Sequence, residues 1–271
     1  MTPVIKLGFS PCPNDTFIFA ALVHGMIDCE GLEFDYKMAD VEHLNHLAME
    51  GTIDMVKVSY HAFLYLAPVY RLLDSGSALG TGNGPLLVSK KKYVLNDLGD
   101  RMVAIPGEYT TAHLLLKLLA PFIQRKKILL FNEIEEAILH EEADAGVIIH
   151  ESRFTYENKG LLKIADLGEE YERLTSSPIP LGGIIARKSL GKETLDKLNR
   201  VMNRSVAFAM ENPVKVMDFV RCNAQEMDEE VMMKHIHLYV NKYTLDLGQD
   251  GRKAIANLFS LALDRGLILN A

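Results

Sequence analysis

Short apolar runs alternate along the chain with segments whose apolar residues recur every three or four positions. Val4–Ser10, Leu32–Met38 and Ile53–Val58 have the length and composition of strands, and a segment with helical spacing follows each of them. The middle third repeats this order around the predicted strands Met102–Ile105 and Ala145–Ile149. Because strands alternate with helices, we expect an α/β fold with mixed, mostly parallel sheets.

The remaining elements follow from the same two periodicities. We expect further strands at Tyr70–Ala78, Leu86–Ser89, Lys127–Phe131, Leu161–Ala165 and Ile184–Arg187. We expect helices at Asn14–His24, Val41–Glu50, Tyr60–Leu66, Ala112–Phe122, Ile134–Glu141, Lys192–Met210, Pro213–Asn223, Glu229–Val240 and Gln249–Gly266. The C-terminal segment is therefore predicted to be helical almost to its end. The glycine-rich GTGNG, Gly80–Gly84, is predicted to be a flexible crossing between two lobes.

One local pattern occurs once in each half of the chain. A helix ends, an aspartate follows, and a short apolar strand leads to a polar residue: Asp54 to Ser59 in the first half, Asp144 to His150 in the second. Ligands of open α/β sheets bind at the carboxyl ends of the strands. Two such edges facing each other would form a cleft between lobes. The alternative is that the pattern has no link to a ligand, because polar residues commonly stand between the strands and helices of α/β proteins.

His150 is the best single candidate for chemistry. It follows four small or apolar residues, Gly146–Ile149, so it should lie at a sheet edge with one side of its ring facing the apolar interior. Histidine is the side chain that exchanges a proton near neutral pH, which suits a general base. A histidine that only caps the following helix is the alternative. The nearby Glu151 and Arg153 could face either the cleft or solvent.

Hydroxyl residues stand where two helices are predicted to begin. Ser59 precedes one helix, and Thr110, Thr111 and Ala112 open another. The first turn of a helix presents unpaired N–H groups and a positive dipole end. Two such ends, one from each lobe, could therefore bind an anion such as a carboxylate. Ordinary helix capping by these hydroxyls is the alternative.

The cysteines and the other histidines do not form a metal-binding pattern. Cys12, Cys29 and Cys222 are widely spaced and odd in number, which is typical of free thiols in a reducing compartment. Cys12 could be a nucleophile before a helix start, but a small packing residue is the favoured interpretation. The pairs His43/His46 and His235/His237 lack a third ligand nearby in sequence, so no metal is expected.

Composition narrows the class of protein. The 271 residues are 48% hydrophobic and 24% charged, which suits one large domain or two lobes with a proper core. The net charge is −7, and no basic excess exists to neutralise nucleic acid. The start of the chain lacks the features of a secretion signal, and no apolar run approaches the ~18 residues of a membrane span. We therefore expect a cytoplasmic protein with neither nucleic acid nor membrane as a partner.

Six motifs together resemble one known family. GFSPCPNDTF, DMVKVSYHAF, GPLLVSKK, AIPGEYTTAHLLLKL, AGVIIHESRFTY and PIPLGGI occur in this order between Gly8 and Ile184. They are similar to the 1,4-dihydroxy-6-naphthoate synthases of the futalosine route to menaquinone. The resemblance implies a type II periplasmic-binding-protein fold with a cleft and a hinge of two crossing strands. We place residues 1–89 and 183–271 in a large lobe and residues 90–182 in a small lobe.

The resemblance also implies an activity and a set of site residues. The members of the family are lyases that convert cyclic dehypoxanthinylfutalosine to 1,4-dihydroxy-6-naphthoate without a cofactor or metal. His150 matches its proton acceptor. Lys57, Val58, Ser59, Thr111 and Ala112 match its substrate-binding segments. A non-catalytic anion-binding protein of the same fold and the related chorismate dehydratase are the alternatives.

The first motif, GFSPCPNDTF, is expected to form one wall of the cleft. Its two prolines should fix the path of the loop that leaves the first strand. Asn14 or Asp15 is expected to cap the following helix, and together with Ser10 to hold the substrate. The expected partner is a small carboxylate substrate, and the sequence leaves a homo-oligomer open.

Overall fold

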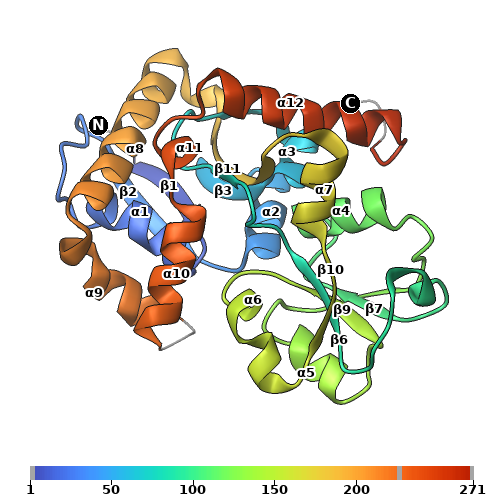
Figure 1. Cartoon of the computed structure of the whole chain (residues 1–271). Coiled ribbons are helices and arrows are strands. Elements are labelled where there is room, and N and C mark those ends of the chain that lie inside the picture. The colour runs from blue at the N-terminus through green and yellow to red at the C-terminus, as the bar shows by residue number, and fades with distance from the viewer. Residues whose placement is uncertain (1–3, 225–227, 269–271) are drawn as a thin grey trace.

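The computed structural model describes residues 4–224 and 228–268, which form two mixed sheets surrounded by helices (Figure 1). The first sheet has the order β2-β1-β3-β11-β4, with β5 paired to β11, and the second has the order β10-β6-β9-β7-β8. The first sheet contains β1 (Val4–Phe9), β2 (Glu33–Met38), β3 (Met55–Ser59), β4 (Tyr70–Leu72), β5 (Ala78–Gly80) and β11 (Ile179–Arg187). The second contains β6 (Leu86–Ser89), β7 (Val103–Ile105), β8 (Lys126–Ile128), β9 (Ala145–Ile148) and β10 (Leu162–Asp166).

Helices surround both sheets, and most lie where the apolar spacing predicts them. The α-helices are α1 (Pro13–Val23), α2 (Val41–Met49), α3 (Tyr60–Leu66), α4 (Thr111–Leu119), α5 (Ile134–Leu139), α6 (Ser152–Thr155), α7 (Leu167–Thr175), α8 (Lys192–Glu211), α9 (Pro213–Asn223), α10 (Glu229–Tyr239), α11 (Lys242–Leu245) and α12 (Gly248–Asp264). Short 3-10 turns are η1 (Leu95–Leu98), η2 (Tyr156–Lys159) and η3 (Lys188–Leu190). In the first lobe, α1 packs against α8, α9 and α10, while α12 packs on β11.

Strand direction corrects one detail of the predicted sheets. β1 pairs in parallel with β2 and β3, and β7 pairs in parallel with β8 and β9. However, β11 is antiparallel to β3, β4 and β5, and β6 is antiparallel to β9 and β10. The sheets are mixed, as predicted, but not mostly parallel. The reason is that β6 and β11 each enter their sheet directly after the chain crosses from the other one.

The chain crosses between the sheets twice, and the two crossing segments touch. The first crossing joins β5 to β6, and the second leads from β10 through α7 to β11. A Cβ atom added at Gly84 would lie 2.3 Å from the Cα atom of Gly168, so only glycine fits at this contact. The N–H of Leu167 also donates to the carbonyl oxygen of Pro85 at 3.0 Å. These contacts join the two crossings into one structural unit.

The segment that contains GTGNG does cross between the sheets, but part of it is regular structure. The sequence predicted one strand over Tyr70–Ala78, whereas two short strands, β4 and β5, stand there on either side of a loop. Gly76 in that loop has a φ of +91°, which a strand cannot accommodate. β5 then pairs with the start of β11, which begins five residues earlier than predicted.

Helix α7 was missed in the sequence, although signals for it were present. Asp166 accepts hydrogen bonds from the N–H groups of Gly168 (2.9 Å) and Glu169 (3.1 Å), so it is a regular N-cap. Leu167 and Tyr171 follow at helical spacing and are fully buried. An aspartate before residues with this spacing indicates a helix start.

The lobe boundaries remain a prediction. Strand pairing alone puts β6 in the second sheet, so by that criterion the first crossing lies before Leu86 and not after Ser89.

Within residues 4–224 and 228–268, no helix is both long enough and apolar enough to cross a membrane.

Candidate active site

A cavity between the two sheets brings together every residue that the sequence assigned to the site. Its lining includes Ser10, Asn14, Asp15, Lys57, Val58, Ser59, Thr111, Ala112 and His150. The parallel pairing explains this convergence. β1 and β3 are neighbours that end at the same sheet edge, and so are β7 and β9 in the other sheet. The loops and helix starts that follow these strands therefore face one another.

A buried ion pair anchors the wall of the cavity formed by the first lobe. The Nζ atom of Lys57 lies 3.1 Å from Oδ1 of Asp15 and donates to the carbonyl oxygen of Gly76 at 2.8 Å. Oδ2 of Asp15 accepts from the N–H (3.2 Å) and the hydroxyl (2.8 Å) of Ser10, and Oδ1 accepts from Nδ2 of Asn14 (2.9 Å). Asp15 is thus held by several donors, and its side chain cannot turn freely toward a ligand.

The start of α1 differs from the prediction. Cys12 occupies the N-cap position, without a side-chain capping bond, and Pro13 begins the helix. Asn14 and Asp15 therefore lie inside the first turn, and the prediction that one of them caps the helix was wrong. The cause is the preference of proline for the first helical position, where its missing N–H costs nothing.

His150 lies two residues after the end of β9, in the cavity wall of the second lobe. Its backbone has a φ of +58°, a left-handed conformation that is uncommon for residues other than glycine. Its Nε2 atom is buried and has no hydrogen-bond partner among the residues that the structure describes. The ring packs edge-on against Phe131, with ring centroids 4.8 Å apart. Glu151 and not His150 stands at the N-cap position of α6, so the helix-cap alternative does not hold.

The surroundings of His150 favour its neutral form. Burial lowers the pKa of His150 to about 4, and the attraction of Asp15 and Asp40 offsets this only in part. At neutral pH the imidazole therefore has a free lone pair. A neutral imidazole at the edge of a buried cavity can accept a proton from a bound molecule.

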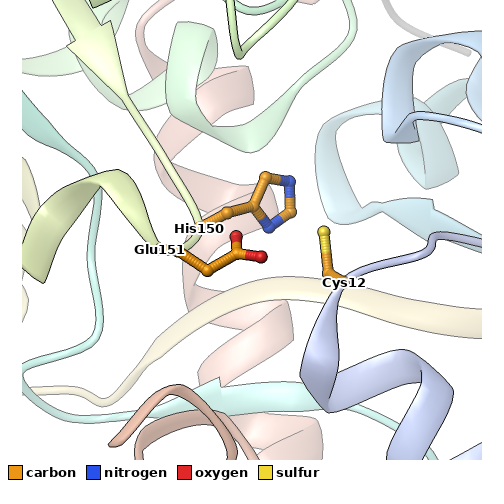
Figure 2. A group of neighbouring side chains, drawn as sticks. All are labelled: Cys12, His150 and Glu151. Carbon is orange, nitrogen blue, oxygen red and sulfur yellow. The ribbon is translucent and has the colours of Figure 1, made fainter. Parts of the chain in front are cut away.

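Cys12 and Glu151 lie next to His150, and Figure 2 shows the three side chains pointing toward one another. One donor atom from each lies within 4.8 Å of the others. Such a set could hold a divalent metal ion such as zinc. Burial and the neighbouring Glu151 raise the pKa of the Cys12 thiol well above its usual value. This disfavours a reactive thiolate, in line with a packing role for Cys12, and the expected absence of a metal stays a prediction.

The two predicted anion-binding helix starts differ in their caps. Thr110 caps α4 by accepting from the N–H of His113 at 3.2 Å. Ser59 stands at the N-cap of α3, as predicted, but makes no side-chain capping bond, so the alternative of ordinary capping does not hold for Ser59. The amide oxygen of Asn45 accepts the N–H of Ser59 at 3.0 Å. Thr111 donates its hydroxyl to the carbonyl oxygen of Leu181 at 2.6 Å.

Hydrogen bonds join the lobes beside the cavity. The N–H of Tyr109 donates to Oε1 of Glu42 at 3.0 Å, and the N–H of His61 donates to Oγ1 of Thr111 at 3.3 Å. Arg153, whose position the sequence left open, does not line the cavity but contacts the crossing segments, and it also interacts with Tyr239 of the cavity lining. It donates to the carbonyl oxygen of Gly84 and, at 3.2 Å, to Oδ2 of Asp166.

Two cavity residues from α10 were not among the predicted site residues. His235 and Tyr239 both line the cavity, and His235 is fully buried. In the sequence, His235 stood out only as one of a pair with His237 that lacks a third metal ligand. In the structure His235 is buried and His237 is exposed. Only the packing of α10 against α1 brings His235 to Asn14, 221 positions away in sequence.

The comparison with known proteins decides the family. Residues 5–264 match the profile of a protein family described as menaquinone biosynthesis. The chain belongs to this menaquinone-biosynthesis family. It is 44% identical over 263 residues to the "1,4-dihydroxy-6-naphtoate synthase" of Thermus thermophilus, a match that covers 97% of this chain and 95% of that protein. The protein of the same name from Streptomyces coelicolor is 43% identical over 269 residues, covering 97% and 94%.

Solved structures confirm the predicted fold of this member of the menaquinone-biosynthesis family. A crystal structure of a protein from Archaeoglobus fulgidus, 34% identical, has a TM-score of 0.92 over 98% of both chains. The alkanesulfonate-binding protein of Xanthomonas axonopodis pv. citri is only 13% identical but has a TM-score of 0.72, covering 100% of this chain and 96% of that one. The second likeness concerns the fold alone, which is periplasmic-binding-protein-like.

Proposed function

We propose that the protein is a 1,4-dihydroxy-6-naphthoate synthase, a lyase that converts cyclic dehypoxanthinylfutalosine to 1,4-dihydroxy-6-naphthoate. The observation that carries this proposal is the match along nearly the whole chain to two relatives of that name. The cavity supports it independently, because a neutral histidine with a buried, unpartnered Nε2 atom lines a cavity between the two sheets. The enzyme would act in the cytoplasm without a metal or other cofactor.

In this proposal His150 is the general base. Its lone pair takes a proton from the sugar-derived part of the substrate. The electron pair left behind forms a new double bond in that part as the adjacent carbon–carbon bond breaks. The electrons of the broken bond stay on the ring part, the sugar-derived fragment leaves, and aromatisation of the second ring drives the reaction. Hydrogen bonds between the lobes, from Tyr109 to Glu42 and from His61 to Thr111, would hold His150 within reach of the substrate.

In this proposal the carboxylate group of the substrate binds at the start of α4. The N–H groups of Thr111 and Ala112 belong to the first helical turn, where a helix has no acceptors of its own. Thr111 and Ala112 both line the cavity. Ser59 faces this site from the end of β3, and its hydroxyl hydrogen is available because Asn45 donates to its oxygen at 3.4 Å. Ser10, Asn14, Asp15, Lys57 and Val58 would form the opposite wall and shape it.

One assay tests the proposal against both alternatives. The purified protein is incubated with cyclic dehypoxanthinylfutalosine and, separately, with chorismate, and the products are identified by mass. We expect the naphthoate from the first substrate and no conversion of the second. Dehydration of chorismate would indicate the related dehydratase. Binding of the first substrate without turnover would indicate a ligand-binding protein, and either result would overturn the proposal.

A further inference from the structure

The buried histidine of α10 has no role in the proposed chemistry so far. We propose that His235 is a positioning residue whose Nδ1 atom accepts a hydrogen bond from a hydroxyl group of the bound substrate. This inference rests on the proposed function, which supplies a substrate with a hydroxylated, sugar-derived part. It extends that function by assigning a second histidine, which would orient the hydroxylated part beside the base His150.

The ion pair Lys57–Asp15 determines which way the Asn14 amide faces. An ammonium group only donates hydrogen bonds, and a paired carboxylate only accepts them. The Asn14 atom that lies 2.9 Å from Oδ1 of Asp15 must therefore be the NH2 group. It follows that the amide oxygen of Asn14 faces the His235 ring, at 2.8 Å from Nε2.

The Asn14 amide in turn determines the tautomer of His235. An amide oxygen can only accept, so Nε2 of His235 carries the hydrogen of this bond. The ring is neutral at ordinary pH. Burial lowers the pKa of His235 well below its usual value, and the nearby His150 and Arg153 lower it further. A neutral imidazole with its hydrogen on Nε2 has a bare lone pair on Nδ1. Nδ1 is therefore an acceptor.

This acceptor is buried without a donor. Nδ1 of His235 has no hydrogen-bond partner among residues 4–224 and 228–268. Oε2 of Glu151 lies 4.0 Å from it, which is beyond hydrogen-bond distance. A buried polar atom is rarely left unpaired, since the lost hydration has a free-energy cost. A hydroxyl group of a bound molecule would supply the missing donor.

The position of His235 suits a group that orients the substrate. Both His235 and His150 line the cavity, and their rings lie nearly parallel, with centroids 6.2 Å apart. A hydroxyl held by Nδ1 would therefore lie beside the atom that His150 deprotonates. Because His235 stays neutral next to His150, it would act as a second acceptor and not as a second base. Fixing the substrate in this way favours the reactive geometry.

Two substitutions separate this role from a purely structural one. The side-chain amide of His235→Gln reaches the place of Nε2, so it can keep the bond to Asn14 but leaves no acceptor at the place of Nδ1. The shorter His235→Asn has the opposite effect, since its amide oxygen can replace Nδ1 while the bond to Asn14 is lost. His237→Gln, an exposed residue on the same helix, is the matched control.

We expect His235→Gln to lower kcat/KM by about 10- to 100-fold, with a melting temperature close to that of wild type. His235→Asn should keep more activity than His235→Gln despite a lower melting temperature, and His237→Gln should match wild type in both. Full activity of His235→Gln, or a larger loss of activity in His235→Asn, would overturn the inference. If the wild-type protein shows no turnover, the proposed function fails, and this result is distinct from either variant outcome.

A second measurement applies even if both variants fail to fold. ¹⁵N NMR of the imidazole rings reports which ring nitrogen carries hydrogen. In a His150→Gln protein, which should bind substrate without converting it, the Nδ1 signal of His235 should be that of a bare nitrogen. It should shift when substrate is added. A hydrogen on Nδ1 in the free protein, or no shift with substrate bound, would contradict the inference.

Discussion

Lys57 and Asp15 form an ion pair in which both side chains are almost fully buried, with 3.1 Å between Nζ and Oδ1. Lys57 comes from the middle of β3 and Asp15 from the first turn of α1, so the pair joins two elements of one cavity wall. Breaking a buried ion pair by removing one member leaves a buried charge without its partner, which is costly.

We therefore predict that Lys57→Met destabilises the protein by about 3–5 kcal/mol, because Asp15 would keep its charge without the ammonium. Denaturation in urea measures this change. The double variant Lys57→Met/Asp15→Asn removes both charges and should recover part of the loss. A double variant that is less stable than Lys57→Met would show that the charge of Asp15 is not the cause.

His150→Ala should lower turnover by ~10²–10⁴-fold with a much smaller change in substrate binding, because the proposed base is lost while the binding groups remain. Steady-state kinetics with cyclic dehypoxanthinylfutalosine measures both quantities. His140→Ala changes an exposed histidine and is the control. Turnover of His150→Ala close to that of wild type would rule out the base.

The pH dependence of kcat/KM should reflect the lowered pKa of His150. Burial lowers this pKa to about 4, so the imidazole is already neutral throughout the neutral range. We predict that kcat/KM is constant from about pH 6 to 8 and declines on the acid side as the pH approaches 4. A decline of kcat/KM centred near pH 6.5, the ordinary pKa of histidine being about 6.5, would contradict the lowered pKa of His150.

Buried histidines should also make folding stability depend on pH. Burial lowers the pKa of His61 to about 3 and that of His113 to about 4, below the ordinary value of 6.5 that applies in the unfolded chain. Below pH 6.5 the unfolded state therefore binds more protons than the folded state. Stability should be fully present above pH 6.5 and decline as the pH falls toward 4. Urea denaturation at pH 7.5, 6.0 and 5.0 tests this, and equal free energies of unfolding at all three would contradict it.

Gly84→Ala should prevent the two crossings from touching. The added Cβ would lie 2.3 Å from Cα of Gly168, and both atoms belong to backbones that cannot swing aside. We expect the variant to be strongly destabilised or insoluble. Gly99→Ala is the control, because a Cβ there meets nothing within 4 Å. The yield of soluble protein and the melting temperature are the measurements, and a Gly84→Ala protein as stable as the control would contradict the contact.

Much of the fold could be predicted because its signals are local. Apolar periodicity indicates the helices α8, α9, α10 and α12 within a few residues, though not the short α11, and the strand–polar pattern indicates where β3 and β9 end. The errors have local causes as well. The positive φ of Gly76 divides one predicted strand into β4 and β5, and Pro13 displaces the expected cap of α1. Strand direction could not be predicted, because it depends on which strands follow a crossing between sheets.

The sequence by itself determined the family, the two-lobed α/β fold and the polar residues that lie at strand ends and helix starts, because these features depend on residue type and short spacing. Only the tertiary structure decided that Lys57 neutralises Asp15, that Arg153 holds the crossing segments and that His235 reaches the cavity. Each of these relationships joins residues that are far apart along the chain, and their partners are selected by packing and by the need to pair buried polar groups.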